Sequence, residues 1–284
     1  MNTAINISAF GFLLSAFWCA LPAGAFPPAP YHTLYGMVRN EMGDPIMDTN
    51  AVVTLETASG VQIKTTVVPS LSAAMNYRLP VPMDAGLTSD AYRPTALQPY
   101  VSFRMKVVIG TTTYLPMELH GNYANLGKPA QSTHLDLTLG VDTDNDGLPD
   151  GWEYATLAAL GWDMDLSLIS PHGRAFPGGM TFYQSYVSGT YAFDPADGFR
   201  LNTAGMATNG NPVLEFTAIT GRTYSLLAST NMTAWFPVPF RNTADGPDAP
   251  SQGRYVASGV RLMRVEAVVP QVTGGGYLFK AQVQ

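Results

Sequence analysis

The first half of the chain contains short stretches in which every second residue is apolar, which is the pattern of β-strands with one buried face. The clearest cases are residues 101–109 and 135–139. Residues 32–39 and 51–56 are separated by a segment with glycine and proline, so they predict a strand, a turn and a second strand. We therefore expect a β-sandwich over residues 26–140.

One segment of this half is poor in strand signals. Residues 69–100 contain five prolines. Proline cannot donate a hydrogen bond to a neighbouring strand, so it is excluded from the middle of a sheet. We expect a long excursion there, with one short strand at residues 77–79.

The second half begins with helical spacing. Trp152, Leu157 and Leu160 recur at the period of a helix and are followed by Gly161, which predicts a helix over residues 151–160. A second helix is predicted at residues 179–189. Strand-like runs separated by Gly, Pro and Asn then predict a smaller β-sandwich: residues 212–216, 222–227, 253–256, 261–265 and 277–279.

The composition agrees with a mainly β fold class. The 284 residues include 27 Gly and 22 Pro but only 13% charged residues, which favours short strands and turns over long helices. We predict two β-sandwich domains, residues 26–140 and 198–284, joined by a small helical connector at residues 141–197. The net charge of −6 is mild, and nothing in it suits nucleic acid.

The N-terminal segment predicts export. Residues 5–25 are apolar, carry no charge and end at Ala23-Gly24-Ala25, a small-x-small pattern, so residues 1–25 are interpreted as a signal peptide. Residues 1–4 lack Lys and Arg, which leaves an uncleaved membrane anchor as the alternative. The single cysteine, Cys19, lies in this segment, so the mature chain would have no thiol chemistry or disulfide. No later run is long and apolar enough to span a bilayer.

One twelve-residue stretch, 142–153, has the spacing of an EF-hand calcium loop. Carboxylates occupy positions 1, 3, 5, 9 and 12, Gly147 occupies position 6, and position 7 offers a backbone carbonyl. Calcium fits such a flexible oxygen cage better than magnesium, which requires a strict octahedron. The predicted metal ligands are Asp142, Asp144, Asp146, Leu148, Asp150 and Glu153.

Two features set this loop apart from a paired calcium sensor. The residues before it, 131–141, are strand-like, so the entering helix is missing, and Pro149 at position 8 has no N–H for a partner loop. We therefore predict a solitary, constitutive clamp. The alternative is that Asp150 and Glu153 only form a capping box at the start of the next helix.

The segment D-x-D-x-D-G-L-P-D-x-W-E resembles the calcium loops of thrombospondin type 3 repeats and dockerins, and especially a segment of multi-domain secreted bacterial proteins. In those proteins a second loop commonly follows, and residues 179–190 keep its frame. Its ligand positions, however, fall on Arg174, Phe176, Gly178 and Ser185. The resemblance covers residues 140–284 and implies an exported, noncatalytic architecture. Residues 36–55 also resemble the opening of transthyretin-type, carboxypeptidase-regulatory-like β-sandwiches.

Other sites are weaker. The histidines, residues 32, 120, 134 and 172, show no zinc-ligand spacing, and no Gly-x-Ser-x-Gly nucleophile elbow occurs. Asp163 and Asp165 are conceivable auxiliary calcium ligands, although a solvated pair is the simpler interpretation. Trp235, Tyr255 and Tyr277 could stack on sugar or pack in the second core.

We therefore expect a secreted, cell-surface or periplasmic protein that is not an enzyme. Its calcium loop would rigidify the junction between β domains, and its partner would be an unknown protein or glycan at the cell surface. Nucleic acid is not expected, and neither is a membrane span after signal cleavage. The alternatives are a carbohydrate-binding accessory protein and a secreted hydrolase whose triad the sequence does not reveal.

Overall fold

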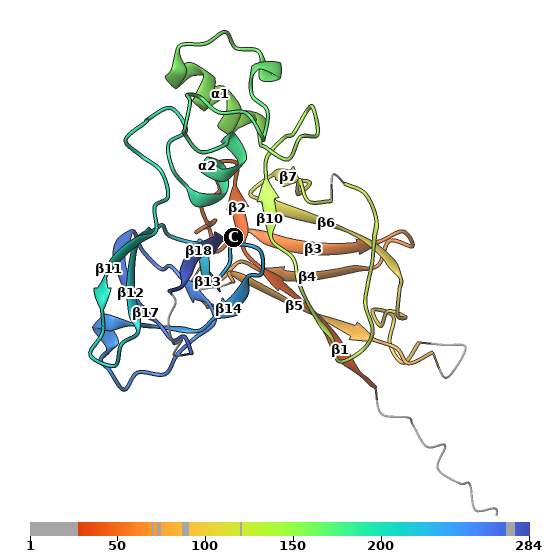
Figure 1. The fold of residues 1–284 in the computed structure, drawn as a ribbon. Helices are drawn as coiled ribbons and strands as arrows, with labels where there is room; N and C mark the ends of the chain where they lie inside the picture. Colours follow the sequence, from red (N-terminus) through yellow and green to blue (C-terminus); the bar gives the residue numbers. More distant parts are fainter. Residues whose placement is uncertain (1–27, 70, 73–74, 87–90, 120, 271–275) are drawn as a thin grey trace, which may run out of the picture.

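The computed structural model describes residues 28–69, 71–72, 75–86, 91–119, 121–270 and 276–284, so the predicted signal peptide lies outside the described residues. The described chain is mainly β and has two α-helices. Figure 1 shows two β-rich parts and a helical segment, drawn in green, that lies above both. None of its helices has the length and apolar character needed to cross a membrane.

The first β-rich part holds three sheets. Their strand orders are β5-β1-β9, β10-β2 and β4-β3-β6-β7, with β8 paired to β6. Apolar side chains of these strands form the first core, which includes the fully buried Leu55, Tyr77 and Met105. The strands are β1 (Ala29–Gly36), β2 (Val38–Asn40), β3 (Val52–Thr57), β4 (Gln62–Thr66), β5 (Tyr77–Met83), β6 (Ser102–Ile109), β7 (Thr112–Tyr114), β8 (Ala124–Asn125), β9 (Ser132–His134) and β10 (Leu137–Leu139).

The predicted strand at residues 77–79 is present but longer than expected. It continues through Pro80 and Pro82 to Met83. Within its sheet β5 pairs only with β1 and forms the edge. No strand of that sheet lies on its other side, so the N–H groups that the prolines lack cost no hydrogen bonds there. The expectation was therefore wrong in length, because an edge strand tolerates the prolines that a central strand would not.

The helical segment contains α1 (Asp150–Leu160), a 3-10 turn η1 (Leu166–Leu168) and α2 (Phe182–Ser188). Both helices end at a glycine in the left-handed conformation, Gly161 and Gly189, with φ of 68° and 72°. Trp152 packs edge-on against Phe182 and Tyr186, with ring centroids 6.4 and 5.6 Å apart. These rings belong to a separate small core.

The second β-rich part has two four-stranded sheets around another core. Their orders are β11-β12-β17-β15 and β14-β13-β16, with β18 also paired to β13. The sequence did not predict β11, β14 or β15. The strands and turn are β11 (Asn202–Met206), β12 (Pro212–Ala218), β13 (Thr223–Ser229), β14 (Phe236–Val238), β15 (Phe240–Asn242), η2 (Thr243–Asp245), β16 (Tyr255–Val256), β17 (Arg261–Ala267) and β18 (Leu278–Val283).

A buried arginine connects the three parts. Arg222, only 4% exposed, donates to the Gly43 carbonyl at 2.6 Å and to the Tyr186 carbonyl of α2 at 3.1 Å. Arg39 donates to the same Gly43 oxygen at 3.3 Å. Burial and the neighbouring Arg39 charge lower the pKa of Arg222. The turn between β2 and β3 therefore meets both the helical segment and the second β-rich part at one point.

Candidate metal centre

The segment between β10 and α1 is folded by its own aspartates. The Asp142 carboxylate accepts hydrogen bonds from the backbone N–H groups of Asp146 and Gly147, at 3.2 and 3.1 Å. Asp146 in turn accepts from the N–H of Leu148 at 2.8 Å. Aspartate often bonds to the main chain a few residues on, and such bonds favour turns. These hydrogen bonds curl the loop without the help of a ligand.

Positive φ angles permit this curl. Asn145 and Gly147 have φ of 60° and 93°. Asparagine and glycine are the residue types that adopt this conformation most readily. The glycine at the sixth position of the loop is therefore explained by backbone geometry.

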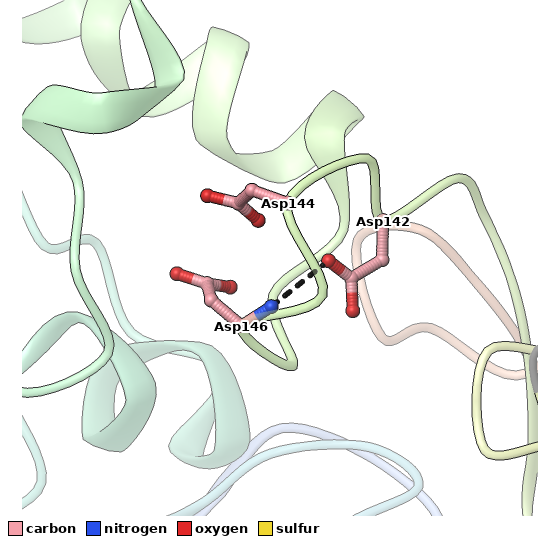
Figure 2. Close-up of side chains that lie close together, drawn as sticks. All are labelled: Asp142, Asp144 and Asp146. Atoms are coloured by element: carbon pink, nitrogen blue, oxygen red, sulfur yellow. Dashed lines mark hydrogen bonds between the residues drawn. The ribbon is translucent and has the colours of Figure 1, made fainter.

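Three of the predicted ligands converge. One carboxylate oxygen from each of Asp142, Asp144 and Asp146 lies within 4.8 Å of the others. Figure 2 shows the carboxylates of Asp144 and Asp146 pointing the same way, with Asp142 bonded to the Asp146 backbone. Like charges at this separation repel by roughly 1 kcal/mol per pair even in water, and by more when partly buried. A cation among them would offset that repulsion.

Glu153 is the most informative residue of the site. It lies in the first turn of α1, is 0% exposed, and neither of its carboxylate oxygens has a hydrogen-bond partner among the described residues. The second oxygen of Asp146 is likewise buried without a partner. Burial, together with repulsion by Asp146 and the other loop aspartates, raises the pKa of Glu153 to about 8. Burial also raises the pKa of Asp146.

Unpaired buried carboxylates are costly. A buried charge is normally paired, hydrogen-bonded or bound to a metal, because its lost hydration must be replaced. Glu153 has none of these protein partners and interacts electrostatically with the aspartate cluster. A cation between Glu153 and the aspartates would replace this lost hydration.

The remaining predicted ligands are placed differently. Both oxygens of Asp150 accept bonds from Thr143, from its N–H at 2.8 Å and its hydroxyl at 2.5 Å. Asp150 therefore ties the start of α1 to the loop and lies outside the converging trio. The Leu148 side chain is fully buried in the core of the helical segment and anchors the loop there, while its backbone carbonyl stays the predicted ligand atom.

The capping-box alternative does not describe the start of α1. Its N-cap is Pro149, and no side chain caps the helix there. By contrast, α2 has a complete capping box between Thr181 and Gln184. The carboxylate of Glu153 is thus not used as a cap.

The second loop, at residues 174–185, has no acid at its predicted ligand positions. Arg174, at its first ligand position, donates to the Gly179 carbonyl. Asp165 caps η1 by accepting bonds from the Ser167 N–H and hydroxyl at 3.0 and 2.8 Å, and these bonds lower its pKa. The carboxylate of Asp165 is therefore bonded within its own turn.

Acids and aromatics elsewhere have partners of their own. Glu56 contacts Arg104 and Lys106, while Glu215 contacts Arg264. The aromatics weighed for sugar stacking or core packing each have a partner in the second β-rich part, and Tyr255 and Tyr277 also pack against its core. Trp235 lies 4.3 Å from the Lys280 ammonium, Tyr255 accepts bonds from Arg261, and Tyr277 donates to the Pro270 carbonyl.

A cleft that the sequence did not indicate lies beside α1. It encloses about 300 Å³ where the β2–β3 turn, α1 and the segment after α2 meet. Trp152, Tyr191, Phe193 and Asp44 contribute to its walls. In the sequence only the two nearby aromatics at positions 191 and 193 hint at the cleft. Two aromatics by themselves do not distinguish a cleft from an ordinary surface.

Comparisons with protein-family models, with curated proteins and with solved structures find no match to this chain. The resemblance to secreted proteins with thrombospondin-type calcium loops therefore stays a prediction that rests on residues 142–153.

Proposed function

We propose that this chain is a secreted or surface-displayed calcium-binding structural protein, in which an EF-hand-like loop rigidifies the junction between two β-sandwich domains. The observation that carries the proposal is the fully buried Glu153 carboxylate, unpaired beside the aspartate cluster. Three separate apolar cores support the division into two β domains and a connector.

The proposed mechanism is mechanical. A bound calcium ion would link Asp142, Asp144 and Asp146 of the loop to Glu153 of α1. The neighbouring Trp152 packs on α2, whose Tyr186 carbonyl accepts from Arg222 of the second β-rich part. Fixing α1 would thus restrain the contact between the β-rich parts. An ion bound only by the folded form stabilises it by about 2.7 kcal/mol at a hundredfold excess over Kd.

Calorimetric titration of the full chain with calcium, paired with thermal unfolding, tests this proposal. We expect one site, a higher melting temperature with calcium, and loss of both effects in Asp146→Ala. Asp248→Asn removes an exposed acid of the second β-rich part, outside the loop, and is the matched control. A melting curve that EDTA leaves unchanged would refute calcium binding.

We further propose carbohydrate binding as a second candidate function, because of the cleft beside α1. Tyr191 and Phe193 are 64% and 38% exposed, and their ring centroids lie 5.3 Å apart. Exposed rings beside a carboxylate and hydroxyls suit a sugar, which has an apolar ring face and polar edges. The cleft has one carboxylate, Asp44, whereas most glycoside hydrolases use two, which supports binding over hydrolysis.

A glycan array tests this second candidate. We expect retention of particular glycans by the wild type and loss with Tyr191→Ala. Tyr183→Ala, which removes an exposed tyrosine outside that cleft, is the control. Equal glycan retention by both variants would exclude the cleft as the binding site.

A further inference from the structure

Among the described residues, strand β18 has a strand partner on only one side of its backbone. Thr223 and Gln284 exchange both backbone hydrogen bonds, at 2.8 and 3.0 Å. In an antiparallel ladder such bonded pairs alternate with pairs whose N–H and C=O groups point the other way. In the register of β13 and β18, Phe279, Ala281 and Val283 therefore direct their backbone groups away from β13.

No described strand takes up these outward groups. β13 is bordered on its other side by β14 and β16, whereas β18 pairs only with β13. A row of unpaired N–H and C=O groups is a template for another strand, and proteins usually blunt it with proline or charge. β18 contains no proline, and its single charged side chain, Lys280, is stacked on Trp235.

A groove runs beside this edge. It encloses about 340 Å³ and is lined by Ala281 and Val283 on one side and by residues around α2 on the other. The α2 side contributes the apolar Met180, Tyr183 and Val187, and no charged residue lines the groove. A strand laid along β18 would place alternate side chains into this space.

The shape and chemistry of the groove point to its occupant. Because α2 forms the opposite wall, the space beside β18 suits a single extended segment better than the edge of a second folded sheet. The uncharged walls select apolar side chains over charged ones. We propose that β18 binds an extended peptide of a partner protein by strand addition, with uncharged apolar side chains of the peptide in the groove. This site is independent of the calcium loop.

Proline substitutions distinguish the two sides of the strand. Ala281→Pro removes an outward N–H and should leave the bonds to β13 intact. Gln282→Pro removes an N–H that faces β13 and should lower the melting temperature markedly. Gln282→Ala keeps every backbone group and controls for the exposed side chain. If Ala281→Pro destabilised the fold as much as Gln282→Pro, the proposed edge would be refuted.

The binding test selects octapeptides from a displayed library on the full-length protein. We expect enrichment of peptides with alternating apolar residues, at least tenfold weaker binding to Ala281→Pro, and unchanged binding to Gln282→Ala. Hydrogen exchange should slow at the amides of Phe279, Ala281 and Val283 when a selected peptide is bound. Failure to enrich peptides that prefer the wild type would overturn the proposal. So would light scattering that shows a dimer which Ala281→Pro converts to a monomer.

Discussion

Replacing Glu153 with methionine should change the stability of the protein in opposite directions with and without calcium. In EDTA, the wild type holds a fully buried carboxylate with no hydrogen-bond partner beside the loop aspartates. Because the pKa of Glu153 is raised to about 8, folding near pH 7 must either protonate this carboxyl or bury its charge, and both cost stability. Replacing buried ion pairs by apolar residues of similar size is often neutral or stabilising by about 1 to 4 kcal/mol. We therefore expect Glu153→Met to be more stable than the wild type in EDTA, with a melting temperature higher by roughly 3 to 10 °C.

In calcium the order should reverse. The wild type gains about 2.7 kcal/mol at a hundredfold excess of calcium over Kd, which amounts to roughly 5 to 10 °C in melting temperature. Glu153→Met lacks the proposed ligand at position 12, so its melting temperature should respond to calcium weakly or not at all. Differential scanning calorimetry in 5 mM EDTA or several millimolar calcium, on the order of extracellular levels for weak sites, measures both orders.

Asp248→Asn is the control, because it removes one acidic charge from an exposed position of the second β-rich part, outside the loop. It should follow the wild type in both buffers. A Glu153→Met variant that is less stable than the wild type by the same amount in EDTA and in calcium would contradict this expectation. That result would mean that the Glu153 carboxylate stabilises the fold without a metal.

Three further predictions concern the scaffold. Arg222→Met should lower the free energy of unfolding in urea by about 3 kcal/mol, since two bonds from a charged donor are lost; an unchanged midpoint would mean that Arg222 does not join the three parts. Arg104 and the other partners of Glu56 lower its pKa to about 2, so its stabilisation holds above pH 4.5 and is lost as the pH falls towards 2. Melting curves of the wild type and Glu56→Gln should therefore converge over that window, and a constant difference would contradict the ion pair. Gly161→Ala should cost about 1 to 2 kcal/mol, because alanine is strained at φ 68°; helix content by circular dichroism should fall if α1 loses its C-terminal turn.

The sequence predicted those helices and strands whose pattern lies within their own residues. The helix at residues 151–160 matches α1 within one residue, because Gly161 ends it by its own backbone conformation. The strand at residues 101–109 matches β6 because its apolar residues alternate. By contrast, β11 is exposed along its whole length, and β14 contains Pro237, so neither shows alternation. These strands form because a neighbouring strand provides the partners for their backbone hydrogen bonds.

For the candidate metal site, too, the sequence predicted the local features and missed the others. Spacing within twelve residues predicted the convergence of Asp142, Asp144 and Asp146. It did not predict that Asp150 would bond to Thr143, because the choice between metal and hydroxyl depends on side-chain geometry. The junction at Arg222 was invisible in the sequence. Its acceptor, Gly43, lies 179 residues away and contributes only a backbone carbonyl, which leaves no signature in residue type.

That backbone carbonyl has an evolutionary consequence. Every residue carries a carbonyl, so the contact to Arg222 does not restrict the side chain of the neighbouring turn residue Met42, whereas the Asp44 carboxylate favours the charged form of Arg222. Position 43 itself is constrained, because a side chain there would collide with the Arg222 guanidinium. Met42 and Asp44 also line the cleft beside α1. Descendants of this chain could therefore change the wall of the cleft at position 42 without weakening the hydrogen bond between Arg222 and Gly43.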